Sequence, residues 1–110
     1  MVEIVHVDDS NFELEVLKSE LPVLVEYGAV WCSPCAQQLP LLEKFALEKG
    51  EQIKVCKVDI DDAPSITSQM GVKSIPTLIL FNGGVAVGFK SGLTPLAAIH
   101  DFVNSKLKSI

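Results

Sequence analysis

Apolar residues along this chain recur with two different spacings, and these spacings predict strands and helices in alternation. Short apolar runs rich in β-branched residues are typical of buried strands, whereas apolar residues three or four positions apart form one face of a helix. By this criterion, strands are expected over residues 2–7, 23–27, 53–60, 78–81 and 85–90, and helices over residues 11–21, 34–49, 61–71 and 95–107. The expected order is therefore β-α-β-α-β-α-β-β-α.

The connections between these elements can also be predicted. Strands separated by helices are joined by parallel crossovers. The Asn82-Gly83-Gly84 segment is a hairpin signal, so the last two strands should pair antiparallel. Ser10 and Glu13 have the spacing of a capping box at the start of the first helix. The aromatic residues expected in the core are Phe81, Phe89 and Phe102.

Length and composition exclude several classes of function. The 110 residues are enough for one domain with its own core, which we expect to span residues 1–110. A net charge of −5 argues against a nucleic-acid partner. No apolar run approaches the ~20 residues that a membrane span needs, and the first residues lack the features of a secretory signal. We therefore expect a cytoplasmic protein that makes no membrane contact and is monomeric by default.

Two cysteines, Cys32 and Cys35, lie between the second predicted strand and the N-terminus of the helix that follows. Free N–H groups and the helix dipole stabilise an anion there, so the pKa of the Cys32 thiol should be lowered and its reactivity raised. A spacing of three places both sulfurs on one side of the first turn. We expect Cys32 to be exposed and Cys35 to be more buried, which would supply a nucleophile and a resolving thiol for thiol–disulfide exchange.

A pair of cysteines at this spacing could instead be half of a metal site. The chain has three cysteines, which are too few for an all-cysteine zinc site, and His6 and His100 lack a paired ligand spacing. We therefore favour redox chemistry and expect no metal. The third cysteine, Cys56, lies in a predicted buried strand, where cysteine is usually a small hydrophobic residue.

Several motifs together make the chain resemble the thioredoxin family over essentially its whole length. They stand in the family's order: Asp8-Asp9-Ser10 before Phe12, Trp31-Cys32 and Pro34-Cys35, Pro40 in the helix, Lys57, Asp61, Ile75-Pro76-Thr77, and the glycine hairpin with Gly92 beyond it. The resemblance implies an α/β thioredoxin fold, in which a central mixed β-sheet is flanked by helices.

The same resemblance implies a protein-disulfide reductase. Cys32 would attack a substrate disulfide to form a mixed disulfide, which Cys35 would then resolve. The electrons reside on the two sulfurs, so the expected redox centre is the Cys32–Cys35 disulfide and no bound cofactor is needed. The expected partners are disulfide-containing proteins and a thioredoxin reductase that donates electrons.

A substrate-binding surface is implied as well. In the family a cis proline lies against the cysteine pair, so the Ile75-Pro76 bond is expected to be cis. The backbone of Ile75 would then pair with an extended substrate segment, in the manner of strand addition. The residues expected to bind substrate are Trp31, Ser33, Pro34, Ile75, Pro76 and Gly92.

Glu26 interrupts the apolar run of the second strand, and a carboxylate is seldom buried without a partner or a task. The family usually has aspartate there, beneath the cysteines, where it takes up the proton of Cys35. Burial would raise the pKa of the Glu26 carboxyl toward neutrality, while Lys57 would lower it. Alternatively, Glu26 and Lys57 form a structural ion pair.

Three more positions near the cysteines depart from the family pattern. Gly28 stands where tryptophan is common, which removes an aromatic wall and adds backbone freedom. Ser33 replaces a glycine between the cysteines, and Ala36 replaces a lysine or arginine, so one positive charge near Cys32 is missing.

Two other functions stay open at this point. One is a disulfide oxidase or isomerase. The other is a thioredoxin-fold binding module, in which the surface around Trp31, Ile75 and Gly92 docks a partner and redox activity is incidental.

Overall fold

The computed structural model describes residues 3–107, and its elements follow the expected order. They are β1 (Val5–Val7), a short π-helical segment η1 (Glu13–Leu17), β2 (Val23–Gly28), α1 (Ser33–Lys49), β3 (Lys54–Asp59), α2 (Pro64–Gln69), β4 (Thr77–Asn82), β5 (Val85–Ser91) and α3 (Leu96–Leu107). Val2, placed in the first strand by its sequence, lies outside the described residues.

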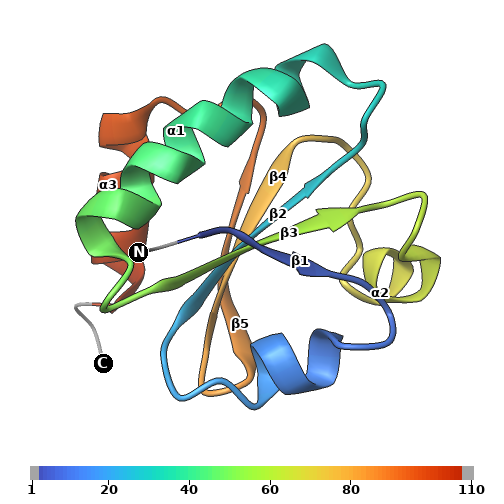
Figure 1. The fold of residues 1–110 in the computed structure, drawn as a ribbon, viewed down its shortest axis with the longest axis horizontal. Coiled ribbons are helices and arrows are strands. Elements are labelled where there is room, and N and C mark those ends of the chain that lie inside the picture. The colour runs from blue at the N-terminus through green and yellow to red at the C-terminus, as the bar shows by residue number, and fades with distance from the viewer. Residues whose placement is uncertain (1–2, 108–110) are drawn as a thin grey trace.

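A mixed five-stranded sheet forms the centre of the molecule, with strand order β1-β3-β2-β4-β5 (Figure 1). Strand β3 pairs parallel with β1 and with β2, while β4 pairs antiparallel with β2 and with β5. The parallel crossovers and the terminal hairpin are thus confirmed. Gly83 and Gly84 form the hairpin turn with positive φ angles of 61° and 80°, a conformation that glycine adopts readily.

Both faces of the sheet are covered, and this explains why β2 reads as a continuous apolar run. Helices α1 and α3 pack on one face, while η1 and α2 lie on the other (Figure 1). Alternate β2 side chains join different cores: Leu24 packs with the α1 and α3 residues, and Val25 and Tyr27 pack with those of η1 and α2. Within residues 3–107, no helix combines the length and apolar character that crossing a membrane requires.

The predicted capping box at the first helix is wrong. The backbone N–H and the hydroxyl of Ser10 both donate to Oδ1 of Asp8, and Glu13 instead forms an exposed ion pair with Lys18. The helical segment that follows is only five residues long, with Phe12 at its N-cap and no side-chain cap. A local Asp–Ser turn competes with capping, because short polar side chains bond readily to nearby backbone.

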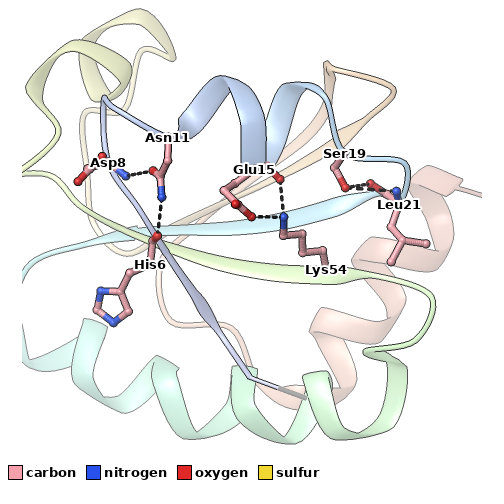
Figure 2. Close-up of polar contacts among 7 residues, drawn as sticks. All are labelled: His6, Asp8, Asn11, Glu15, Ser19, Leu21 and Lys54. Carbon is pink, nitrogen blue, oxygen red and sulfur yellow. Dashed lines mark hydrogen bonds and ion pairs between the residues drawn. The ribbon is translucent and has the colours of Figure 1, made fainter. Parts of the chain in front are cut away.

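Other polar contacts hold η1 against the sheet (Figure 2). The side chain of Asn11 accepts a hydrogen bond from the N–H of Asp8 at 2.8 Å and donates to the carbonyl of His6 at 3.1 Å. On β3, the ammonium of Lys54 donates to the carbonyl of Glu15 at 2.9 Å and pairs with its carboxylate. The Asn11 bonds are local and hold the turn before η1 to the end of β1, whereas the Lys54 contacts span 39 positions and hold the short helical segment against β3.

The core assignment of the aromatic residues is correct for Phe81 and Phe102 and wrong for Phe89. Phe89 is 55% exposed. It lies on β5, which is an edge strand and therefore has a neighbouring strand on one side only. Alternation alone does not distinguish an edge strand from a central one.

Candidate active site at the start of helix α1

Cys32 and Cys35 form a disulfide at the junction of the β2 loop and α1, with their Cα atoms 5.2 Å apart. Cys32 is the N-cap of the helix, in extended backbone conformation, and Cys35 lies in the first turn. The N–H of Cys35 donates to the sulfur of Cys32 at 3.3 Å. A sulfur placed at a helix N-terminus meets free N–H groups and the positive end of the dipole, which favour the thiolate once the pair is reduced.

Cys32 is not exposed, contrary to the prediction from the sequence. Cys32 is 7% exposed and Cys35 is 4% exposed, so the order is as predicted but both residues are buried. Ala29, Ile60 and Ile75 pack against the pair. Ile60 directly follows β3 and Ile75 precedes β4, so both come from segments distant in the sequence, and the residues around the cysteines give no sign of this packing.

Trp31 is exposed beside the pair, and its indole is held in place by one hydrogen bond. Nε1 of Trp31 donates to Oδ2 of Asp61 at 2.8 Å, from the loop that follows β3. Ser33 and Pro34 are exposed in the first turn of α1. These three predicted substrate-binding residues therefore share the surface next to the cysteines, and Asp61 holds the indole of Trp31 in place there.

The loop before β4 supplies the other side of the site. The Ile75–Pro76 bond is cis, which confirms the expectation. Pro76 is buried, and Ile75 packs against the cysteines. The N–H of Gly92 donates to the carbonyl of Pro76 at 2.8 Å, and the φ angle of Gly92 is +87°, in the region that favours glycine. Ile75 therefore lies beside the cysteines, while Pro76 follows it through the cis peptide bond and Gly92 is joined to Pro76 by one backbone hydrogen bond.

Glu26 is 2% exposed and lies on the side of the sheet that α1 covers. Burial raises the pKa of its carboxyl from 4.5 to about 7, and the positive charge of Lys57, its neighbour in the β2–β3 register, partly opposes this. Within residues 3–107, Oε2 of Glu26 has no hydrogen-bond partner. No nitrogen–oxygen contact within 4.0 Å joins Glu26 to Lys57 among these residues, so the structural ion pair is not supported.

A cavity of about 180 Å³ lies between β2, β3 and α1 beside the buried acid. Its lining residues are Glu26, Gly28, Ala29, Val30, Cys35, Ala36, Leu39, Lys57, Val58 and Asp59. A methyl group on Gly28 would place its carbon 3.1 Å from Cβ and Sγ of Cys35 and 3.3 Å from Oε1 of Glu26. Gly28 therefore keeps both the sulfur and the carboxyl in close contact with the backbone of β2.

The sequence analysis missed one buried polar residue of α1, Gln38. Its Nε2 donates to the carbonyl of Thr94 at 2.9 Å, and its Oε1 accepts from the N–H of Thr94 at 2.8 Å. Gln38 is three residues after Cys35 and four before Leu42, on the buried stripe of the helix. A polar residue on an otherwise apolar stripe was the available signal.

Cys56 and the histidines lie apart from this site. Cys56 is fully buried in β3, and burial raises the pKa of its thiol to about 12, which suits a small hydrophobic residue and not a reactive one. His100 of α3 contacts the carboxylate of Glu48 of α1, and His6 is exposed on β1. Among residues 3–107, no group of three or more His, Cys, Asp or Glu side chains could hold a metal ion.

The site therefore combines a reversible disulfide at a helix N-terminus, a buried carboxyl behind it and a backbone loop in front of it. These are the parts that thiol–disulfide exchange uses: a sulfur that can carry charge, a second sulfur that can displace a partner, and a group of suitable pKa for proton transfer.

Comparison with known proteins points the same way. A family model described as Thioredoxin matches residues 3–105. The chain is 41% identical over 102 residues to a thioredoxin of Rickettsia bellii, covering 93% of this chain and 97% of the relative. It is 36% identical over 107 residues to a thioredoxin of Haemophilus influenzae, covering 97% of this chain and 100% of the relative.

A third relative, thioredoxin 1 of Synechococcus elongatus, is 40% identical over 101 residues, covering 92% of this chain and 94% of the relative. These likenesses do not favour the oxidase, isomerase or binding-module alternatives. Cys32 and Cys35 lie within the matched range and form the disulfide that such chemistry requires. The chain belongs to the thioredoxin family and is a thiol–disulfide oxidoreductase of the protein-disulfide reductase type.

Proposed function

We propose that Cys32 is the attacking sulfur and Cys35 the resolving one. The Cys32 thiolate attacks a substrate disulfide, forms a mixed disulfide and releases one substrate thiolate. Cys35 then loses its proton and attacks the sulfur of Cys32, which re-forms the Cys32–Cys35 disulfide and releases the second substrate thiolate. Two electrons pass from the dithiol to the substrate. The observation that carries this assignment is the N–H of Cys35, which donates to the sulfur of Cys32 at the helix N-cap.

Glu26 is the proposed acceptor of the Cys35 proton. The methyl position on Gly28 that lies 3.1 Å from the sulfur of Cys35 also lies 3.3 Å from Oε1 of Glu26, so the two groups share one side of β2. A carboxyl with a pKa of about 7 is suited to exchange a proton near neutral pH. Lys57 acts through Glu26, because its charge keeps the carboxyl pKa from rising further.

The proposed substrate surface surrounds the disulfide. An extended segment would pair with the backbone of Ile75 next to cis Pro76, in the manner of strand addition. The remaining residues of this surface are Trp31, Ser33, Pro34 and Gly92. All six lie on loops or in the first turn of α1, and among the loop residues Ile75 packs against the cysteines.

The proposal also covers the partners of the protein, its localisation and its oligomeric state. The substrates are disulfide-containing proteins, and a thioredoxin reductase returns electrons to the Cys32–Cys35 disulfide, so no bound cofactor is required. A net charge of −5 supports a protein without nucleic-acid partners. We place it in the cytoplasm as a monomer, with residues 1–110 forming a single thioredoxin domain that makes no membrane contact.

Single-cysteine variants test this proposal. Cys35→Ser should accumulate a mixed disulfide between Cys32 and a protein substrate, because the resolving thiol is gone. Cys32→Ser should lose protein-disulfide reduction and trap no substrate. Intact mass after acid quenching, followed by peptide mapping, identifies the joined cysteine. Substrate trapped on Cys35 in the Cys32→Ser protein would reverse the assignment, and reduction that survives Cys32→Ser would refute it.

A further inference from the structure

A continuous line of hydrogen bonds runs from the second turn of α1 to the cis-proline loop. Gln38 is joined to the backbone of Thr94 by two bonds, of 2.9 Å to its carbonyl and 2.8 Å from its N–H. The hydroxyl of Thr94 donates to the carbonyl of Gly92 at 3.0 Å. The N–H of Gly92 in turn donates to the carbonyl of Pro76 at 2.8 Å.

The contact between Gln38 and Thr94 consists of two hydrogen bonds, so it constrains the relative orientation of the two residues. Gln38 and Thr94 are both buried, and each polar atom of the Gln38 amide has a partner. Two bonds to the N–H and carbonyl of one residue fix orientation as well as distance. Losing them would leave buried backbone groups unpaired, which is costly in a protein interior. An apolar contact at this position would hold the helix and the loop together without fixing their relative placement.

Both ends of the line lie at the active site. Gln38 is one helical turn after Cys35, on the same buried stripe of α1. Gly92 and Pro76 belong to the surface on which we propose that substrate binds. The line therefore connects the helix that carries the reacting sulfurs to the loop that would hold the substrate backbone.

We propose that Gln38 is a positioning residue that sets the placement of the cis-proline loop relative to Cys32. With the line intact, a segment paired with Ile75 presents its disulfide to the sulfur of Cys32. Without it, the loop and the helix still pack together, but their alignment is no longer fixed. This inference rests on the proposed substrate surface, and it assigns Gln38 no contact with the substrate.

The prediction distinguishes two kinds of substrate. A protein disulfide uses both the loop and the sulfur, whereas a small aromatic disulfide needs only the sulfur. Gln38→Met keeps the length of the side chain and removes both bonds to Thr94. We expect its KM for a reducible protein such as insulin to rise about tenfold, because misplaced groups lose much of their effective alignment. The rate with the small disulfide should stay within about twofold, since the cysteines and Glu26 are untouched.

Gln37→Met is the matched control. Gln37 is the exposed neighbour of Gln38 on the same helix, so the chemical change is identical and the line is intact. In this control, the KM for the protein disulfide and the rate with the small disulfide should both equal the wild-type values. If Gln38→Met fails to fold, Thr94→Val decides the matter. That variant removes only the hydroxyl bond to Gly92 and keeps the backbone groups that Gln38 binds. It should shift the ratio of the two activities in the same direction, by a smaller factor.

Equal losses on both substrates, or an unchanged ratio in a folded Gln38→Met protein, would overturn the proposal. Pro76→Ala separates this failure from failure of the substrate surface itself. If Pro76→Ala leaves the ratio of protein to small-disulfide activity unchanged, the proposed surface is wrong. If Pro76→Ala lowers that ratio and Gln38→Met does not, the surface stands and only the role of Gln38 is refuted.

Discussion

Two buried polar side chains near the disulfide, Gln38 and Glu26, differ in one respect. Every polar atom of the Gln38 amide is paired with the backbone of Thr94. Oε2 of Glu26 has no partner within residues 3–107, and burial raises the pKa of its carboxyl to about 7. A satisfied group holds its neighbours in place, whereas an unsatisfied ionisable group near neutral pKa is available for proton transfer.

Tyr27 shows that an unpaired buried polar group is not enough for such a role. Its hydroxyl also lacks a partner within residues 3–107, and burial raises the pKa of the phenol above its ordinary value. However, Tyr27 packs in the core on the η1 and α2 face, on the opposite side of β2 from Glu26. The proton transfer that we propose therefore requires an unsatisfied ionisable group that also lies on the face of β2 covered by α1 and Cys35.

The largest effect should be on the pH dependence of stability. In the oxidised protein, Glu26 has a pKa of about 7 folded and an ordinary value of 4.5 unfolded. The folded state therefore holds a proton that the unfolded state releases. The stability this contributes is complete below pH 4.5 and is lost as the pH rises to about 7, a total of about 3 kcal/mol.

Glu26→Gln should abolish this dependence. Urea unfolding from pH 4 to pH 8 gives the free energy of unfolding of each protein, and their difference isolates residue 26 from other titrating groups. The wild-type value should fall relative to the variant across that window. Glu43→Gln, an exposed carboxylate on α1, is the control and should leave the profile unchanged. A pH-independent difference between wild type and Glu26→Gln would mean that the Glu26 pKa is not raised.

The next largest effect is on catalysis. Without an acceptor for the Cys35 proton, resolution of the mixed disulfide should slow about tenfold or more in Glu26→Gln, while attack by Cys32 is preserved. Single-turnover stopped-flow measurements with a disulfide substrate separate the two steps. Gln38→Met should retain the wild-type rate of resolution, since it keeps the carboxyl. A normal resolution rate in Glu26→Gln would assign the proton to another acceptor.

A smaller effect is expected at Gly28. Gly28→Ala would bring a methyl carbon to 3.1 Å from the sulfur of Cys35 and 3.3 Å from Oε1 of Glu26. Overpacking of this kind should lower the free energy of unfolding by about 1 kcal/mol. Combined with Glu26→Asp, whose shorter side chain withdraws the carboxyl, the cost should be smaller. A double-mutant cycle measures this coupling, and strictly additive effects would show that Gly28 does not constrain Glu26.

The smallest effect should be that of Tyr27→Phe. Removing a buried hydroxyl that has no partner should leave the free energy of unfolding unchanged within about 0.5 kcal/mol, or raise it. Protein-disulfide reduction should also be unchanged. Thermal and urea unfolding check the first expectation, and turnover of a protein disulfide checks the second. A loss above about 1 kcal/mol would show that the hydroxyl is satisfied after all.

Much of the molecule could be predicted because the relevant signals are local. The spacing of apolar residues predicted the order of the helices and strands that the structure describes over residues 3–107, and Cys32 and Cys35 were placed correctly at the start of α1. The errors are of one kind. The Ser10 capping box, the exposure of Cys32 and the burial of Phe89 each depend on competing or distant neighbours, which periodicity does not contain.

The sequence by itself determined the fold class, the redox pair and the presence of a carboxyl in a buried strand, because residues that are adjacent or periodically spaced indicate each of these features. Only the tertiary structure decided which buried polar groups are satisfied. Gln38 meets its partner across 56 positions, and Glu26 comes beside Cys35 only when α1 packs on the sheet. The free energy of a buried polar group depends on whether a hydrogen-bond partner lies next to it. Long-range packing determines which groups become neighbours.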